Sequence, residues 1–404
     1  MKIRVCLVFL LVTMLFLCSC GAGNGPTREV PLTPLPKEGE GMNNGQTDPD
    51  RPREKALFGV GNDNVKPIGR TVMIDGVRWC GFSGSGMEFF FAGRSLSIRL
   101  VADQMASDEI HRARVGIFVD GKCMRDILMD EPYKTVSVID QEEDTIAIVR
   151  VVKLSEVSDS TVGIESVEAD GAITPLQASE RKIEFIGDSI TCGYGVDGVY
   201  GEDFYRTANE DCTKAYAYRT AGLLDADYSI VAMSGYGIVS GYTATGEKVP
   251  EQIIPPYYTT YGRSYGSFAE AFAPEQLDWD FSEFVPDTIV VNLGTNDISY
   301  CRDDPDRRQE YIDGYKDFLR IIRENNPDAK IVCVLGIMGT DLCESMEIAA
   351  REYSEEQGDA NIATMHFPVQ NEEEDGVAVD WHPSETTHEK AANQLAEFLR
   401  YLSE

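Results

Sequence analysis

Hydrophobic and polar positions change their spacing near residue 180, and this change divides the chain into two predicted folded parts. Before it, apolar side chains recur at every second position in short segments, as at Leu96, Ile98 and Leu100. Such alternation is typical of β-strands with one buried face. Asp120-Gly121 is a hairpin signal between two of the segments. With no helical spacing between them, these regularly spaced segments predict a β-sandwich. The expected strands are 95–100, 114–119, 123–129, 134–139, 145–154 and 161–169.

After residue 180, short apolar strands alternate with segments of helical spacing. The last of these helices carries apolar or small side chains at Ala391, Leu395, Phe398, Leu399 and Leu402, which is the spacing of one helix face. Strand–helix alternation predicts a parallel sheet covered by helices on both faces, an α/β three-layer fold. The expected strands are 182–186, 228–233, 288–293, 330–335 and 361–366, and the expected helices are 213–224, 308–325, 342–357 and 384–402.

The N-terminus carries a targeting pattern. Lys2 and Arg4 precede an apolar run over 5–17, which is too short to span a bilayer and fits the core of a signal peptide. The run ends in Leu17-Cys18-Ser19-Cys20-Gly21. This resembles the lipobox of bacterial lipoproteins, and an ordinary cleaved signal peptide is the alternative. The resemblance implies a lipoprotein signal peptide over 1–20 and a lipid on Cys20. The protein would then be exported and membrane-anchored at the bacterial cell surface.

The segment 21–55 is rich in Gly, Pro, Asn and Asp, and we expect a disordered stalk there. The formal net charge of the whole chain is −32. A protein this acidic repels nucleic acid and anionic lipid surfaces, which excludes both as partners of the folded part.

Cysteine usage argues against a disulfide framework. Of ten cysteines, seven follow Cys20, and an odd number without a Cys-x-x-Cys pair favours small buried side chains. The cysteines form no metal-binding pattern, and we expect neither a metal nor another cofactor.

Candidate chemistry gathers where the predicted parallel strands end. Gly187-Asp188-Ser189 follows the first strand, Ser234-Gly235-Tyr236-Gly237 the second, and Gly294-Thr295-Asn296-Asp297 the third. A fourth block, Asp380-Trp381-His382-Pro383-Ser384, precedes the last helix. The carboxyl ends of parallel strands meet at one edge of the sheet, where active sites of α/β proteins lie. Each block alone also fits an ordinary turn, but four in this order indicate a serine-dependent hydrolytic site.

The four blocks resemble those of the SGNH hydrolases, the GDSL-type esterase superfamily. Upstream, Gly69-Arg70, Trp79 and the glycine- and serine-rich run 81–86, followed by Phe89-Phe90-Phe91, resemble the N-terminal jelly roll of carbohydrate esterase family two. Together they imply a jelly-roll β-sandwich domain over 56–178 and a flavodoxin-like SGNH hydrolase domain over 180–404.

The resemblance and the chemistry together assign roles. Ser189 is expected to be the nucleophile and His382 its general base. The backbone N–H groups of Ser189 and Gly235 and the Asn296 amide would hold the oxyanion, with Gly237 as the alternative to Gly235. The usual superfamily spacing Asp-x-x-His would place the acid at position 379, which is a valine. Asp380 is therefore the favoured third catalytic group, and a backbone carbonyl supporting a Ser–His dyad is the alternative.

Other aromatic, histidine and acidic side chains receive mostly structural interpretations. Trp381 is the candidate for stacking on a sugar ring, whereas Trp279 is expected in the core. Asp188 and Asp297 are expected to orient loops. The remaining histidines are His111, read as a surface group, His366, read as structural or near the cleft, and His388, read as solvent-facing. The tyrosines 257, 258 and 261 lie in a long irregular stretch, 240–285, that is a candidate lining of the cleft.

The predicted function is removal of O-acetyl groups from an acetylated polysaccharide or oligosaccharide, such as xylan or mannan, by acyl transfer to water. One alternative is an SGNH esterase acting on peptidoglycan or sialate acetyl groups or on lipid esters. Another is a non-catalytic glycan-binding surface protein.

Overall fold

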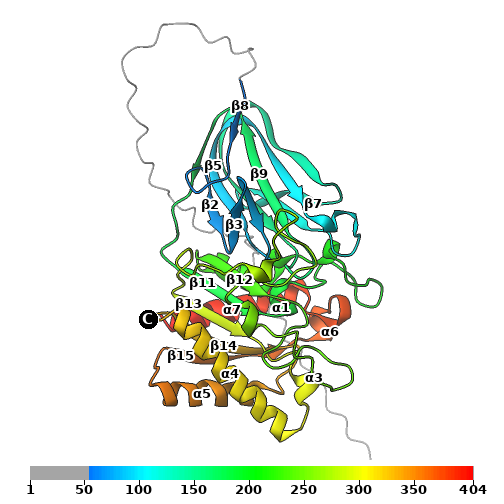
Figure 1. The fold of residues 1–404 in the computed structure, drawn as a ribbon, viewed down its shortest axis with the longest axis vertical. Helices are drawn as coiled ribbons and strands as arrows, with labels where there is room; N and C mark the ends of the chain where they lie inside the picture. The colour runs from blue at the N-terminus through cyan, green and yellow to red at the C-terminus, as the bar shows by residue number, and fades with distance from the viewer. Residues whose placement is uncertain (1–53, 404) are drawn as a thin grey trace, which may run out of the picture. The chain divides into compact units, whose positions relative to one another are not determined.

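The computed structural model describes residues 54–403. The predicted signal peptide, Cys20 and the stalk up to residue 53 lie outside the described residues. Within the described range, none of the helices combines the length and the apolar character that crossing a bilayer requires. One antiparallel sheet and one parallel sheet follow one another along the chain (Figure 1). The predicted pairing of an antiparallel β-domain with an α/β domain is confirmed.

The antiparallel sheet has the order β3-β4-β9-β5-β8-β6-β7, with β1 on β9 and β2 and β10 on β5. The predicted segments 134–139 and 145–154 form one continuous strand, β8, and strand 95–100 is part of the longer β5. The strands are β1 Ala56–Phe58, β2 Lys66–Ile68, β3 Thr71–Ile74, β4 Val77–Cys80, β5 Gly86–Ala102, β6 Arg114–Val119, β7 Lys122–Leu128, β8 Tyr133–Lys153, β9 Val162–Ala169 and β10 Ala172–Pro175.

The sheet curls because its longest strands, β5 and β8, pair on both sides of a break in register that lies between Gly93 and Ser95. On one side of this break β5 also pairs with β10, and on the other side it pairs with β9. A register shift of this kind bends a strand and increases its twist. The two halves of the sheet therefore enclose a common apolar core, which includes Phe89, Phe91 and Ile98.

The parallel sheet has the order β12-β11-β13-β14-β15. Its strands are β11 Lys182–Gly187, β12 Asp227–Ala232, β13 Thr288–Asn292, β14 Lys330–Ile337 and β15 Ile362–Val369. The α-helices are α1 Ser189–Cys192, α2 Tyr216–Leu223, α3 Ile298–Cys301, α4 Pro305–Asn325, α5 Cys343–Gln357, α6 Glu372–Asp375 and α7 Glu385–Tyr401. Short 3-10 turns occur at Gln104–Ser107, Thr207–Asn209, Cys212–Lys214, Pro255–Tyr257, Pro274–Gln276 and Val379–Trp381.

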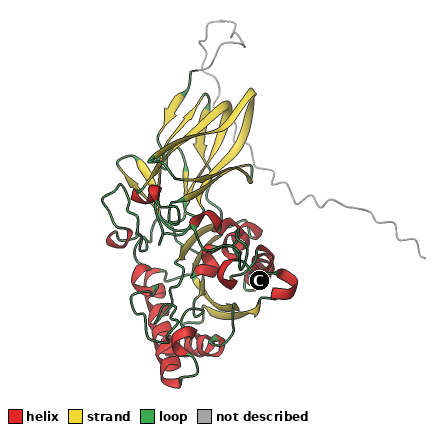
Figure 2. Cartoon of the chain, turned by 90° about the vertical axis from the view of Figure 1, so that its right-hand side faces the viewer, coloured by secondary structure: helices red, strands yellow, loops and turns green. Residues whose placement is uncertain are grey.

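Helices cover both faces of the parallel sheet (Figure 2). On one face, Tyr311 of α4 and Met346 of α5 share a core cluster with side chains of the strands. On the other face, Tyr216 of α2 and Leu395 of α7 do the same. The α/β three-layer prediction is therefore confirmed, and the sheet edge that bears the candidate residues is held on a rigid core.

The antiparallel sheet also contributes to the core of the parallel sheet. The loop 154–161, between β8 and β9, is buried along nearly all of its length, and Val157 packs in the cluster beneath α4 and α5. Arg70 is fully buried and pairs with Glu184 of β11 at 3.1 Å. A loop with this much buried backbone needs internal hydrogen-bond partners. The two sheets are thus joined by the buried loop 154–161 and by the Arg70–Glu184 ion pair.

Several aromatic side chains of the long connection 240–285 are buried in the core. Tyr258 is fully buried and Tyr261 nearly so, and Trp279 packs beside Tyr261 in a small aromatic cluster, as the core interpretation of this tryptophan predicted. The guanidinium of Arg70 lies 5.0 Å from the centre of the Tyr258 ring. The prediction that Tyr258 and Tyr261 line the cleft is wrong, because the buried Arg70 draws this loop inward.

Candidate active site

Three of the predicted blocks meet at the carboxyl edge of the parallel sheet. In β11, Gly187 stands in register with Ala232 of β12 on one side and with Asn292 of β13 on the other. The turns that follow these strands are therefore neighbours, although long stretches of chain separate them. This places Ser189 between the turn that contains Gly235 and the turn that contains Asn296.

Ser189 begins a one-turn helix, α1, directly after β11. The Asp188 carboxylate accepts the Ile190 N–H at 3.0 Å and caps that turn. His382 comes from the turn before α7, and its Nε2 lies 2.9 Å from Ser189 Oγ. The structure brings together the serine and the histidine, 193 residues apart in the chain, in the geometry that a nucleophile and its base require.

The other ring nitrogen of His382 contacts a backbone group. Nδ1 lies 3.1 Å from the Val379 carbonyl oxygen, and because a carbonyl only accepts, Nδ1 must carry the proton. This leaves Nε2 free to accept the Ser189 proton. The predicted contact between Asp380 and His382 Nδ1 is wrong. The Asp380 side chain is exposed and accepts a hydrogen bond from the Tyr194 hydroxyl at 2.8 Å.

A strained turn explains why the carbonyl and not the acid faces the histidine. Asp380 and Trp381 both have left-handed backbone conformations, with φ of 52° and 64°, which is uncommon for residues other than glycine. The His382 N–H also donates to the Val379 carbonyl at 3.1 Å. The tight turn directs this carbonyl toward the imidazole and the Asp380 side chain toward solvent. Position 379, where the superfamily spacing expects an acid, thus supplies its backbone oxygen.

The His382 ring belongs to a stack of three rings. Tyr194 lies parallel to Tyr205, with ring centres 4.0 Å apart, and its other face covers His382 at 4.2 Å. Burial lowers the pKa of His382 to about 4, an effect that the Val379 carbonyl opposes only in part. His382 is therefore neutral near pH 7, the state in which an imidazole accepts a proton.

Two backbone N–H groups are available at the predicted oxyanion position. Neither the Ser189 N–H nor the Gly235 N–H has an acceptor among residues 54–403. Gly235 has a φ of 82° and open space where a Cβ would lie, so its backbone conformation is what requires glycine. The alternative, Gly237, donates its N–H to the Gln252 carbonyl at 3.1 Å. Asn296 Nδ2 lies 2.9 Å from the Tyr236 carbonyl and 3.4 Å from Asp188 Oδ2.

The two aspartates that flank the site hold its loops. Asp297 accepts the backbone N–H groups of Ile238, Val239 and Ser240 at 2.8–3.1 Å. Burial raises the pKa of Asp297 to about 6 and that of Asp188 to about 7. These hydrogen bonds, with the one from the Ile190 N–H to Asp188, fix the chain beyond Gly235 and the one-turn helix that begins at Ser189, as the loop-orienting interpretation of both residues predicted.

The other predicted side chains lie at different depths. Trp381 is half-buried beside His382, and its Nε1 donates to Glu372 at 3.3 Å. His366 pairs with Glu347 at 3.0 Å and His111 with Asp108 at 3.1 Å. His388 was predicted to face solvent and this is wrong: it is buried, and its Nδ1 accepts the Tyr216 N–H at 3.2 Å.

A buried polar cluster behind the site was missed by the sequence interpretation. Glu156 and Glu210 lie here with Lys153, Asp159 and Tyr205. Glu156 Oε2 accepts the N–H of Ser234, the residue before Gly235, at 2.7 Å. Neither spacing nor motif marks Glu156, because it stands in a loop between two strands and its partner lies 78 residues away. The one available signal was the concentration of polar residues in 153–161.

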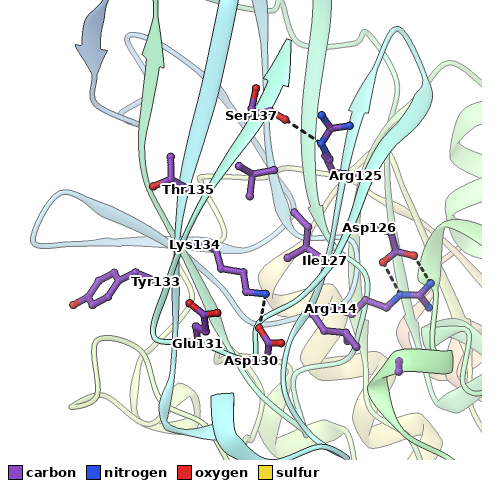
Figure 3. A pocket seen from close by; sticks show the side chains of 13 residues that line it. Arg114, Arg125, Asp126, Ile127, Asp130, Glu131, Tyr133, Lys134, Thr135 and Ser137 are labelled. Atoms are coloured by element: carbon purple, nitrogen blue, oxygen red, sulfur yellow. Dashed lines mark hydrogen bonds and ion pairs between the residues drawn. The ribbon is translucent and has the colours of Figure 1, made fainter. Parts of the chain in front are cut away.

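A hollow lies on the antiparallel sheet. It is an open groove of about 870 Å³ beside β7 and β8, and Arg125, Tyr133 and Lys134 are among its lining residues (Figure 3). None of the residues around Ser189 lines this groove. The groove is therefore not part of the candidate active site.

Comparisons with known proteins agree with this geometry. Residues 185–390 match the model of the GDSL-like Lipase/Acylhydrolase family, and residues 67–178 match the Carbohydrate esterase 2 N-terminal model. The chain is 31% identical over 323 residues to the Cellulase/esterase CelE of Acetivibrio thermocellus. That match covers 78% of this chain and 36% of the relative, so the chain spans about a third of that protein's length.

Two further matches cover most of this chain and most of the matched protein. An acetylxylan esterase / glucomannan deacetylase of Cellvibrio japonicus is 26% identical, over 84% of this chain and 89% of that protein. The solved structure of a family two carbohydrate esterase from Clostridium thermocellum in complex with cellohexaose is 29% identical. It superposes with a TM-score of 0.72 over 83% of this chain and 98% of that one.

Proposed function

We propose that this chain, which belongs to the GDSL-like lipase/acylhydrolase family, is a serine esterase that removes O-acetyl groups from plant cell-wall polysaccharide such as xylan or glucomannan. The observation that carries the proposal is the 2.9 Å contact between Ser189 Oγ and the Nε2 of a neutral His382. The polysaccharide substrate is supported by the names of the similar proteins, an acetylxylan esterase / glucomannan deacetylase among them.

The geometry supports a two-step reaction. His382 Nε2 takes the Ser189 proton while Oγ attacks the acetyl carbonyl. The Ser189 and Gly235 N–H groups stabilise the negative charge that develops on the carbonyl oxygen. The Asn296 amide joins them by exchanging its longer contact, 3.4 Å to Asp188 Oδ2, for the oxyanion. His382 then protonates the leaving sugar oxygen, and an acetyl group remains on Ser189. A water molecule gives its proton to His382 and attacks this ester, which releases acetate and restores the serine.

In this mechanism the catalytic pair is a dyad. The Val379 carbonyl accepts the Nδ1 proton at 3.1 Å, fixes the tautomer and stabilises the imidazolium that forms after proton transfer. Asp380 acts through Tyr194, whose ring covers one face of His382. Trp381 adjoins the base and is half-buried, so its remaining exposed surface is the proposed stacking platform for a sugar ring.

The acyl group and the class of activity are tested together. Acetylated xylan, acetylated glucomannan, O-acetylated peptidoglycan and O-acetylated sialate, with a p-nitrophenyl ester series from acetate to decanoate, are offered to the wild type and to Ser189→Ala, and binding of the polymers is measured alongside. Acetate release that depends on Ser189, with the rate falling as the chain lengthens, supports the proposal. A preference for long chains points to lipid esters, and acetate release only from peptidoglycan or sialate points to those substrates. Glycan binding without any hydrolysis would mean a binding protein instead.

The cellular placement is part of the same proposal. The lipobox-like sequence at Cys20 supports export and a lipid anchor at the bacterial cell surface, where polymeric substrates are accessible. Metabolic labelling with an alkyne fatty acid is expected to mark the wild type and not Cys20→Ala. Labelling of neither, with the protein released into the medium, would indicate an ordinary cleaved signal peptide.

A further inference from the structure

The loop 154–161 of the antiparallel sheet reaches the back of the proposed catalytic site. Ser234 and Gly235 form the turn that follows β12, and the Gly235 N–H has no acceptor among the described residues. The Ser234 N–H, one peptide earlier, donates to Glu156 Oε2 at 2.7 Å. Fixing one peptide restricts the orientation of the next, so the direction of the Gly235 N–H depends on this contact.

Glu156 is itself held at three points. Its backbone N–H donates to Glu210 Oε2 at 2.9 Å, and its carbonyl accepts from Lys153 Nζ at 2.7 Å. Its carboxylate also accepts from the Ser158 hydroxyl at 3.1 Å. Next to it, Val157 is buried in the core of the parallel sheet. The acceptor that faces Ser234 is therefore rigid and fully buried.

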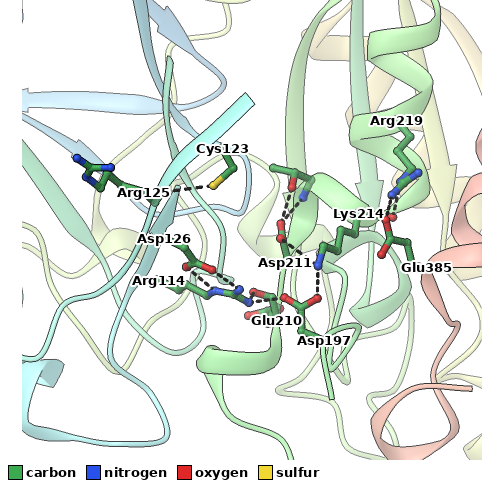
Figure 4. A network of polar contacts seen from close by, with 11 residues as sticks. Arg114, Cys123, Arg125, Asp126, Asp197, Glu210, Asp211, Lys214, Arg219 and Glu385 are labelled. Carbon is green, nitrogen blue, oxygen red and sulfur yellow. Dashed lines mark hydrogen bonds and ion pairs between the residues drawn. The ribbon is translucent and has the colours of Figure 1, made fainter. Parts of the chain in front are cut away.

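The same cluster also contacts residues that lie next to Ser189 and next to His382. Cys192, on the one-turn helix that begins at Ser189, has its Sγ 3.8 Å from Glu156 Oε2. Tyr205 donates to Glu210 Oε2 at 3.0 Å, and its ring stacks on Tyr194, which covers His382. Around this cluster, Arg114 of β6 holds the Glu210 carbonyl at 3.0 Å, and its contact with Asp197 is drawn in Figure 4.

The cluster contains three buried carboxyl groups, on Glu156, Asp159 and Glu210, and one buried amine, on Lys153. Burial lowers the pKa of Lys153 and raises the pKa values of Glu156 and Glu210, and it raises the pKa of Asp159 to about 8. Oxygen and sulfur atoms of Glu156, Cys192 and Glu210 lie within 4.8 Å of one another. Glu156 Oε2 and Glu210 Oε2 already accept hydrogen bonds there, from the backbone N–H groups of Ser234 and Glu156 and from the Tyr205 hydroxyl. The cluster is therefore suited to holding hydrogen bonds in place.

Building on the proposed esterase function, we propose that Glu156 is a positioning residue, whose carboxylate fixes the Ser234–Gly235 turn so that the Gly235 N–H faces the oxyanion. The antiparallel sheet then completes the hydrolytic site. It is an integral part of catalysis rather than a separable glycan-binding module.

The test separates the reach of the side chain from its charge. Glu156→Gln keeps an oxygen at the same distance from the Ser234 N–H and removes the charge. Glu156→Asp keeps the charge and withdraws the oxygen by one methylene. Loss of one oxyanion donor lowers kcat about 10²- to 10³-fold. We expect a fall of about that order for Glu156→Asp with KM changed less than about threefold, and kcat within about fivefold of wild type for Glu156→Gln.

Glu88 provides the matched control. It is a buried carboxylate of β5, and its ion-pair partners among residues 54–403, Lys66 and Arg150, lie outside the loops of the site. Glu88→Asp is expected to lower the thermal unfolding midpoint and to leave kcat unchanged. Unfolding curves of all variants show whether each is folded at the assay temperature.

A second measurement does not depend on the identity of the ester. A fluorophosphonate reacts when Ser189 Oγ bonds to phosphorus, fluoride leaves and His382 takes the serine proton, and the phosphoryl oxygen occupies the oxyanion position. We expect the labelling rate to fall for Glu156→Asp and to hold for Glu156→Gln. Labelled wild type that releases no acetate would overturn only the proposed substrate, whereas unlabelled wild type would overturn both proposals. Equal rates for wild type and Glu156→Asp, or equal losses for Asp and Gln, would overturn the positioning role.

Discussion

Replacement of Asp380 by asparagine separates a catalytic triad from a dyad. If Asp380 oriented His382 as a triad acid, its conversion to an amide would lower kcat about 10⁴-fold, equivalent to about 5.4 kcal/mol of barrier. In the structure the Asp380 carboxylate is exposed and contacts Tyr194 at 2.8 Å, whereas His382 Nδ1 meets the Val379 carbonyl at 3.1 Å. The two arrangements therefore predict very different losses.

The expected loss follows from the one hydrogen bond that changes. A hydrogen bond of this kind contributes about 1 kcal/mol, which corresponds to about fivefold in rate if all of it acts on the barrier. Asparagine also keeps an acceptor for the Tyr194 hydroxyl and tolerates the left-handed backbone of position 380. We therefore expect kcat on p-nitrophenyl acetate to fall by no more than about fivefold.

The control removes the same hydrogen bond from its other end. Tyr194→Phe keeps the ring that covers His382 and deletes the hydroxyl. Because both substitutions act on one contact, Asp380→Asn should have no further effect in the Tyr194→Phe background. Steady-state kinetics from pH 5 to 9 would show whether the profile is also unchanged. A loss of 10³-fold or more for Asp380→Asn alone would refute the dyad and restore Asp380 as the acid.

Four further predictions concern the pH dependence of activity, the pH dependence of stability, the Arg70 ion pair and metals. Since burial lowers the pKa of His382 to about 4, protonation of this base should lower kcat/KM only toward pH 4. Asp188 and Asp297 have pKa values of about 7 and about 6, so an acid limb centred near 6.5 contradicts this only if it persists in Asp188→Asn and in Asp297→Asn. Below about pH 6.5 the folded protein keeps His382 and His388 neutral, whereas the unfolded chain binds protons at both residues. The free energy of unfolding should therefore decrease as the pH falls from 6.5. Arg70→Met leaves Glu184 buried without its cation and should lower the free energy of unfolding by about 3–5 kcal/mol in urea titrations. The kcat of the folded fraction should not change. An unchanged free energy of unfolding would show that the pair does not join the sheets. EDTA should leave activity unaltered, and a loss restored by Zn²⁺ would indicate that Glu156, Cys192 and Glu210 hold a metal.

The strands and helices could be predicted from the sequence because their burial follows a regular spacing. The five parallel strands match the predicted segments within three residues at each end. In the antiparallel sheet, the short strands β1, β2, β3, β4 and β10 are not among the strands predicted from the sequence. The polar run 140–144 was also interpreted as a break between two strands, whereas the run lies within β8. That run stays extended because β5 pairs with both of its flanks, a long-range contact that local polarity does not reveal.

The sequence was sufficient to predict those candidate site residues that lie in a turn after a strand. Ser189, Gly235 and Asn296 come directly after β11, β12 and β13, and strand topology alone brings those turns together. The support of His382 was not predictable, because it depends on the left-handed conformations of Asp380 and Trp381. The role proposed for Glu156 was equally hidden, since it arises where a loop of one sheet enters the core of the other.

The central claim is that Ser189, activated by His382, removes acetyl groups from polysaccharide. The most direct measurement is acetate release from acetylated xylan and glucomannan by the wild type and by folded Ser189→Ala. The account predicts release by the wild type and a fall of at least about 10³-fold for the variant. Undiminished release by Ser189→Ala, or none by a folded wild type on either polymer, would contradict it.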